Sequence, residues 1–255
     1  MAWMGHAFLL SLLAGLSTGV GGMAVLVCRP GARMMAFSLG FAAGVMTTVS
    51  LTDLLPGAAA AYAQSRTPLT GALCAVSLCC AGMVCALLLG RCIPQPQPPA
   101  GMQTLRGRAL HSAAVTMAAL VLHNLPEGVL TMFTGYAAPG RGAPLALAVA
   151  LHNLPEGLAV AVPVCYATRS RVRGVLYALA SGLAEPLGAL LAFALLGRFL
   201  TPLLLNGMVA FIAGVMLQVC AAELLPESFC YARRATAACG FCTGCALMFA
   251  GLYLV

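Results

Sequence analysis

The hexapeptide His-Asn-Leu-Pro-Glu-Gly occurs at residues 123–128 and again at residues 152–157, inside two long apolar stretches. Each copy places an imidazole and a carboxylate where a membrane helix normally carries hydrocarbon. Such groups cost roughly 2.5 to 3.5 kcal/mol each near the middle of a bilayer, so they are retained mainly for function. The two copies therefore indicate both the fold class and the region where a site is expected.

The composition is that of a protein that crosses a membrane several times. Of the 255 residues, 62% are hydrophobic and only 7% are charged, and the mean hydropathy is +0.98. These values exclude an ordinary soluble domain and are typical of an all-α polytopic membrane protein, with the lipid bilayer as a partner and no nucleic acid. All six acidic residues lie in helix-length apolar runs, close to a proline. They are Asp53, Glu127, Glu156, Glu185, Glu223 and Glu227.

Eight membrane-spanning helices are predicted, at roughly 20 apolar residues per crossing. We place them at about residues 6–27, 34–60, 69–90, 109–135, 143–167, 173–196, 203–229 and 236–254. The first helix is expected to be retained, because the N-terminus lacks the positive start of a cleaved signal peptide. The break at residues 91–108 is rich in proline and arginine and predicts a linker without its own fold. Residues 1–255 then form a single transmembrane domain.

The arginines predict how the helices are oriented. The chain has no lysine, and its thirteen arginines lie mainly between the apolar stretches. Ten fall in or beside the loops after helices 1, 3, 5 and 7, which places those loops in the cytoplasm and both termini outside. The ten are Arg29, Arg33, Arg91, Arg106, Arg108, Arg169, Arg171, Arg173, Arg233 and Arg234, and the other three are Arg66, Arg141 and Arg198.

The helix centres place the polar residues in depth. Helices 4, 5 and 6 are centred near residues 122, 155 and 185, so their histidines and glutamates are predicted close to the bilayer midplane. The residues at this level are His123, Glu127, His152, Glu156 and Glu185. Asp53 and Glu223 lie roughly 10 Å from the midplane on opposite sides, Asp53 towards the outside and Glu223 towards the inside.

Two helices share a motif in opposite orientations. Ala-Gly-Val-Met occurs at residues 43–46 and 213–216, and each copy is followed by an acidic residue, two leucines and a proline. The predicted topology makes helices 2 and 7 run in opposite directions. This predicts an inverted repeat that relates helices 1–3 to helices 6–8, with helices 4 and 5 as the central pair. We expect one half of the repeat to move against the other around a midplane site.

Each hexapeptide can offer several metal ligands. Its His and Glu lie four residues apart on one helical face, with the Asn on an adjoining stripe. Its proline frees a backbone carbonyl and permits a kink beside a cavity. The segment SGLAEPLG at residues 181–188 adds Glu185, with Ser181 one turn earlier. Mixed nitrogen and oxygen ligands suit Zn²⁺, with Fe²⁺, Mn²⁺, Co²⁺ and Cd²⁺ as competitors, and bridging carboxylates would permit one ion or two.

Other polar or sulfur-bearing residues have simpler interpretations. Met46 and Met216 lie near the midplane at symmetric positions, where packing and thioether ligation are both open. His6, His111 and Glu227 lie near helix ends, and we interpret them as structural or solvated groups.

Three cysteines in the last helix have a spacing that resembles a metal motif. Cys239, Cys242 and Cys245 form CxxCxxC, but steps of three residues spread around a helix and no histidine accompanies them. We interpret them as packing residues, and their role is left open.

Together these motifs closely resemble the ZIP family of divalent metal transporters (Zrt- and Irt-like proteins), in particular the short bacterial zinc-uptake type. The resemblance covers nearly the whole chain, including AGVMLQVCAAELLPE at residues 213–227. It implies an inner-membrane protein with periplasmic termini and a two-metal transport site. The implied ligands are His123, Asn124, Glu127, His152, Asn153, Glu156 and Glu185. It also implies a path past Asp53 outside and Glu223 inside. One departure is that the histidine-rich loop of many relatives is missing.

The resulting hypothesis is import of zinc, and of other divalent cations, by alternating exposure of the midplane site. Zinc is then the transported ion, no organic cofactor is expected, and a homodimer is an open expectation. The alternatives are an intramembrane metalloenzyme and a metal exporter or sensor. An enzyme needs an open metal position and a general base, commonly in a His-Glu-x-x-His motif, which this chain lacks. Only the family resemblance favours import over export.

Overall fold

Helices account for nearly all of the described residues. A computed structural model describes residues 2–28, 31–64, 67–92, 105–137, 139–191, 193–194 and 201–254. The helices are α1 (Ala2–Gly22), α2 (Ala24–Val27), α3 (Ala32–Val49), η1 (Ser50–Leu54), α4 (Leu55–Ala63), α5 (Pro68–Cys92), α6 (Leu105–Ala137), α7 (Pro139–Thr168), α8 (Arg171–Gly182), α9 (Ala184–Leu191), α10 (Pro202–Val219), η3 (Cys220–Leu224), α11 (Leu225–Tyr231) and α12 (Arg234–Leu254).

Eight helical segments within these residues are long and apolar enough to span a membrane, which confirms the predicted number. Apart from the end of the sixth span, their ends lie within about three residues of the predicted ones. The expected linker is partly helical, since α5 continues to Cys92 and α6 begins at Leu105. The rest of that linker, residues 93–104, lies outside the described residues, as does the predicted end of the sixth span.

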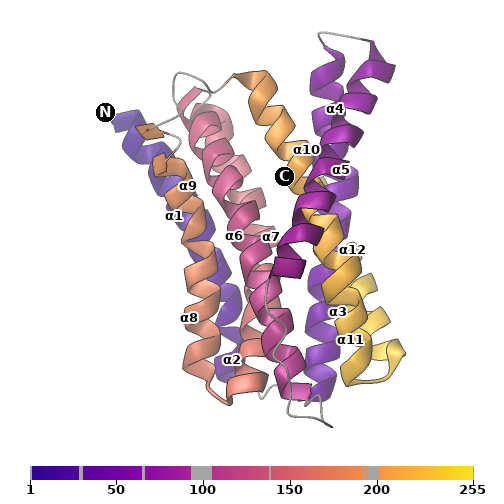
Figure 1. Cartoon of the computed structure of the whole chain (residues 1–255). Coiled ribbons are helices and arrows are strands. Elements are labelled where there is room, and N and C mark those ends of the chain that lie inside the picture. The colour runs from indigo at the N-terminus through magenta and orange to yellow at the C-terminus, as the bar shows by residue number, and fades with distance from the viewer. Residues whose placement is uncertain are drawn as a thin grey trace.

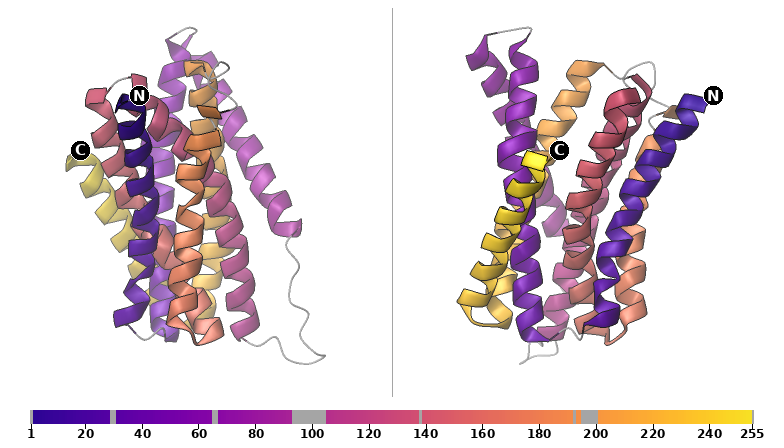
Figure 2. Two further views of the ribbon diagram at one scale, coloured as in Figure 1. Left: turned by 90° about the vertical axis from the view of Figure 1, so that its left-hand side faces the viewer. Right: turned by 180° about the vertical axis from the view of Figure 1, so that it is seen from behind.

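The helices pack as two bundles, seen side by side in Figure 1 and from two further directions in Figure 2. The first bundle contains α1, α2 and α6 to α9, and the second contains α3 to α5 and α10 to α12. The closest packing is α1 on α7 and α6 on α7 in the first bundle, and α3 on α12 and α5 on α10 in the second. Contacts between the bundles are sparser and run mainly from α3 to α7 and from α10 to α6.

The inverted repeat is visible in the chain direction and in local geometry. The α3 helix rises in Figure 1 while α10 descends, and both termini lie towards the same end. Each of these helices ends in one turn of π-helix, η1 or η3, directly before a Leu-Pro pair. Single π-helical turns inside α-helices are frequent at functional sites. The two turns carry Asp53 and Glu223.

The halves of the repeat are not the packing units. The first bundle combines spans 1, 4, 5 and 6, and the second combines spans 2, 3, 7 and 8, so each bundle takes helices from both halves. This packing does not match the division assumed in the expectation that one half moves against the other, and the movement itself stays a prediction. The physical reason is that helices of opposite halves interlock within one bundle, as their glycines show.

Glycines bring the helices of each bundle into backbone contact. A Cβ on Gly157 would collide with the carbonyl of Thr18, and one on Gly21 with the carbonyl of Leu154, so α1 and α7 interlock. The same reciprocal arrangement joins α6 to α9 through Gly128 and Gly188, α5 to α10 through Gly82 and Gly214, and α3 to α12 through Gly44 and Gly244. Close packing through small residues favours rigid helix pairs in membranes. Each bundle is therefore expected to move as one body.

Replacing Gly44 by alanine is expected to destabilise the protein. The new Cβ would collide with the carbonyl of Phe241 and come within 3.0 Å of the Cys245 nitrogen, both backbone atoms that cannot give way cheaply. Overpacking of this kind costs about 1 to 3 kcal/mol. Thermal unfolding in detergent, followed by size-exclusion chromatography, measures the loss. Gly251→Ala is the matched control, since nothing lies within 4 Å of its new Cβ, and equal melting of both variants would contradict the prediction.

Candidate metal centre

The two hexapeptides meet inside the first bundle. One copy lies on α6 and the other on α7, and these neighbouring helices pack against each other. Their predicted ligand side chains are all buried, as is that of Glu185 near the start of α9. The buried set is His123, Asn124, Glu127, His152, Asn153, Glu156 and Glu185. Packing of α6 against α7 and α9 thus gathers residues from three predicted spans.

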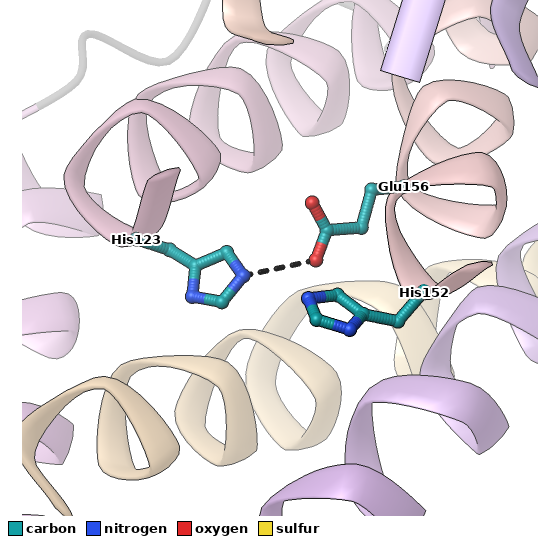
Figure 3. A group of neighbouring side chains, drawn as sticks. All are labelled: His123, His152 and Glu156. Carbon is teal, nitrogen blue, oxygen red and sulfur yellow. Dashed lines mark hydrogen bonds and ion pairs between the residues drawn. The ribbon is translucent and has the colours of Figure 1, made fainter. Parts of the chain in front are cut away.

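The histidines and glutamates pair reciprocally between the two copies. His123 Nε2 lies 3.0 Å from Glu156 Oε1, and His152 Nε2 lies 3.0 Å from Glu127 Oε1. Figure 3 shows the His123 ring and the Glu156 carboxylate pointing toward each other, with the His152 ring beside them. Within the first copy, His123 Nε2 is 3.4 Å from Glu127 Oε1. The closest pairs therefore join two helices, which the spacing within one helix did not predict.

The asparagines attach this pair of helices to the rest of the bundle. The Asn124 amide donates to the carbonyl oxygen of Ser181 on α8 at 3.0 Å. The Asn153 amide donates to the carbonyl oxygen of Ala14 on α1 and to Glu185 Oε2, both at 3.0 Å. These bonds orient the amide oxygens and hold the Glu185 carboxylate in place.

Several acceptor atoms of the group are buried without a hydrogen-bond partner. They are His123 Nδ1, Asn124 Oδ1, Glu127 Oε2, Asn153 Oδ1, Glu156 Oε2 and Glu185 Oε1. An unpaired buried polar atom costs about 1 to 3 kcal/mol, more for a charged group, so such a concentration in one place calls for a partner. A cation is the kind of partner that such lone pairs bind.

The arrangement of the donor atoms fits a divalent metal ion. One ligand atom each from His123, His152 and Glu156 lies within 4.8 Å of the others. Two ligand bonds of about 2.2 Å reach at most about 4.4 Å, so these side chains would move slightly closer together around a bound ion. Within the part of the chain that the structure describes, this is the one such group of His, Cys, Asp or Glu side chains. Glu127 and Glu185 add further carboxylates. Their mutual repulsion in a buried site is relieved when divalent cations bind.

Comparison with known proteins assigns the family. A family profile described as ZIP Zinc transporter matches residues 96–251. The chain belongs to the ZIP family. It is 39% identical to zinc transporter ZupT of Corynebacterium aurimucosum, with 100% of this chain and 98% of that protein covered. It is also 38% identical to zinc transporter ZupT of Chlorobium luteolum, covering 98% and 97%. With zinc transporter ZupT of Stenotrophomonas maltophilia the identity is 39%, covering 89% and 87%. The resemblance seen in the motifs is thus confirmed, and the chain is a multi-pass membrane protein.

In this ZIP protein, Asp53 and Glu223 line two separate cavities. Asp53 is exposed in η1 and lines a largely apolar groove of ≈ 970 Å³ between α1, α3, α7 and α12. The groove also reaches Leu154 and Pro155 of the second hexapeptide, although none of the predicted ligand side chains lines it. Glu223 in η3 lines a cavity of ≈ 400 Å³ between α5, α6 and α10.

The other predicted path residues are buried near the centre in less direct roles. Ser181 receives the Asn124 bond through its carbonyl oxygen, while its hydroxyl donates to the Ala178 carbonyl at 2.8 Å. Met46 and Met216 belong to the main apolar core, and Met216 Sδ accepts a bond from the Ser50 hydroxyl at 3.5 Å. Packing therefore accounts for both methionines, and thioether ligation remains a prediction.

The CxxCxxC cysteines do not gather around one point in this ZIP protein. Cys239 and Cys242 are exposed on α12, while Cys245 is partly buried and donates to the Gly44 carbonyl oxygen at 3.5 Å. They do not form a metal-binding group among the described residues.

One buried residue beside the centre, Thr18, was not predicted from the sequence. Thr18 is fully buried on α1, and its hydroxyl has no hydrogen-bond partner. The Asn153 bond to Ala14 mirrors the Asn124 bond to Ser181, so α1 corresponds to α8 and α9 in the repeat. Aligning AGLSTGVG at residues 14–21 with SGLAEPLG at residues 181–188 puts Thr18 opposite Glu185. This alignment could have identified Thr18 from the sequence. It shows that only one half of the repeat supplies a carboxylate at this position, that of Glu185.

Zinc is expected to stabilise the wild-type protein against heat and to leave the Glu156→Gln variant unchanged. Glutamine keeps the size of the side chain but loses the anionic oxygens that face the other ligands. A ligand at about 100 times its Kd adds roughly 2.7 kcal/mol to the free energy of unfolding. Melting of purified protein with and without zinc measures this. His6→Ala, at an exposed position, should keep the zinc shift, and an equal shift in Glu156→Gln would contradict the centre.

Proposed function

We propose that this protein carries zinc into the cell through the centre formed by α6, α7 and α9. The observation that carries the proposal is the reciprocal pairing of His123 with Glu156 and of His152 with Glu127. Buried acceptor atoms without partners surround these pairs. The relatives that match over nearly the whole chain are named zinc transporters, and the family is one of transporters rather than enzymes.

The two bundles suggest how the centre is exposed alternately to the two sides. All of the proposed ligands lie on helices of the first bundle, whereas Asp53 and Glu223 lie on the second. The two bundles make few contacts with each other, mainly between α3 and α7 and between α10 and α6, and we call this interface the seam. Within each bundle, glycines bring the helices into close backbone contact. The first bundle therefore moves with its ion against the second, and Asp53 and Glu223 attract the cation at the two ends of that movement.

The orientation of the path follows from the arginines. Their bias puts the termini on the periplasmic side, so Asp53 lies towards the outer opening and Glu223 towards the cytoplasm. An ion would pass Asp53, exchange its water shell for the ligands of the centre, and leave past Glu223. The groove from Asp53 to Leu154 and Pro155 supports the outer part of this path.

The donor set supports zinc as the main cargo. Imidazole nitrogen and carboxylate oxygen atoms suit Zn²⁺, and they also bind Fe²⁺, Mn²⁺, Co²⁺ and Cd²⁺. The carboxylates of Glu127, Glu156 and Glu185 provide enough negative charge for one or two divalent ions. No step of this transport needs an organic cofactor, and residues 1–255 act as one transmembrane transporter domain.

Purified protein in liposomes is expected to take up zinc, and Glu127→Ala is expected to lower the rate by about 10-fold or more, as loss of groups around a metal does. The alanine removes a carboxylate that contacts both histidines. Radioactive zinc uptake measures the rate, and competition with iron, manganese, cobalt and cadmium ranks the cargo. Undiminished uptake by Glu127→Ala would remove the centre from the mechanism. Glu227→Gln, far from the two hexapeptides in sequence and paired with Tyr231, serves as a carboxylate control.

A further inference from the structure

A second group of ligand-type side chains lies at the inner end of the molecule. The cavity of ≈ 400 Å³ there is lined by Gly90 and Arg91 at the end of α5, by His111 on α6, and by Gln218 and Glu223 at the end of α10 and in η3. None of these residues belongs to the two hexapeptides. Of these residues, Glu223 alone was predicted from the sequence to lie on the path, and His111 was interpreted as a helix-end residue.

The cavity lies on the seam between the two bundles. His111 comes from the first bundle, while Gln218 and Glu223 come from the second. A Cβ on Gly90 would lie 3.9 Å from Glu223 Oε1, so the absence of a side chain at Gly90 leaves room beside the carboxylate. An ion held here would contact both bundles at once.

The His111 imidazole has an unused ligand atom. Its Nδ1 is buried and has no hydrogen-bond partner, although the cavity beside it is lined by polar groups. The imidazole and the Glu223 carboxylate line the same cavity. One imidazole nitrogen, one carboxylate and one amide oxygen are a common set of ligands for a divalent transition-metal ion, with water completing the coordination.

The position of His111 suits an ion that has left the centre. His111 precedes His123 on the same helix, which places it about 18 Å further toward the cytoplasmic end at 1.5 Å per residue. The chain has four histidines, and His111 is the one on the inner side of the two at the centre. The corresponding outer cavity at Asp53 has no histidine among its lining residues. The two ends of the path are therefore chemically different.

We propose that His111 and Glu223, with Gln218 beside them, form a second binding site for a divalent metal cation, which receives the ion from the centre before its release. This rests on the proposed transport function. The site binds more weakly than the centre, because it has one carboxylate and one imidazole, and because the exposed guanidinium of Arg91 on its rim repels a cation. Weak binding favours release. Movement of the bundles apart at the seam separates His111 from Glu223 and opens the site.

Zinc uptake into liposomes tests whether the two residues act together. His111→Ala and Glu223→Ala are each expected to lower uptake about fivefold, and the double variant is expected to be no slower than the slower single variant, because residues of one site are not additive. His111→Gln, which keeps a polar side chain, guards against misfolding. His6→Ala is the matched histidine control, because His6 lies near the start of α1, outside this cavity. Wild-type uptake in His111→Ala, or losses that multiply in the double variant, would overturn the proposal.

Direct binding separates this site from the transport function. In the full chain carrying Glu127→Gln and Glu156→Gln, equilibrium dialysis with zinc is expected to show a weak saturable site. Adding His111→Ala should abolish that site, while adding His6→Ala should leave it unchanged. Binding that survives His111→Ala would overturn the proposal. Because dialysis does not require transport, a protein that binds zinc at His111 but moves none would contradict the proposed function alone.

Discussion

The pairing of two imidazoles with two carboxylates between α6 and α7 is the constraint on which the rest of the structure depends. Inside a membrane, a polar group must find its partners within the protein, because neither lipid nor bulk water supplies them. Each histidine meets the glutamate of the other helix at 3.0 Å, so neither helix satisfies its polar groups alone. The two helices must therefore lie side by side at a fixed register. Gly128 and Gly157 then bring α9 and α1 against them at backbone distance.

The inverted repeat explains why the surroundings of the centre come in pairs. The asparagines of both copies donate to carbonyl oxygens of equivalent helices, at Ser181 and Ala14. The turns of π-helix that carry Asp53 and Glu223 occur at equivalent places, each before a Leu-Pro pair. The symmetry is incomplete where Thr18 stands opposite Glu185. A site with a carboxylate on one side and a hydroxyl on the other presents two unequal positions to a cation.

The two bundles carry different groups of polar residues. One bundle holds the proposed ligands, and the other carries Asp53 and Glu223, the acidic residues proposed for the ends of the path. Reciprocal glycine contacts join α1 to α7 and α6 to α9 in the first bundle, and α3 to α12 and α5 to α10 in the second. The seam between the bundles is where cavities form, and both Asp53 and Glu223 face cavities bounded by helices of both bundles. In the proposed mechanism, relative movement at this seam changes access to the centre without disturbing the packing inside either bundle.

The amino-acid sequence by itself determined the number of spans, their approximate ends and the inverted repeat, because hydropathy and helical spacing depend on neighbours along the chain. It also supplied the side chains that we propose as ligands. It also placed His123, His152 and Glu185 at one depth. Only the tertiary structure decided which side chains meet. Spacing within a helix suggested His123 with Glu127, whereas packing pairs His123 with Glu156. Packing also divided the spans into bundles that mix both halves of the repeat, and it brought His111 and Glu223 to one cavity. These outcomes depend on which faces of distant helices come together, and the order of residues in a single helix carries no information about its partner.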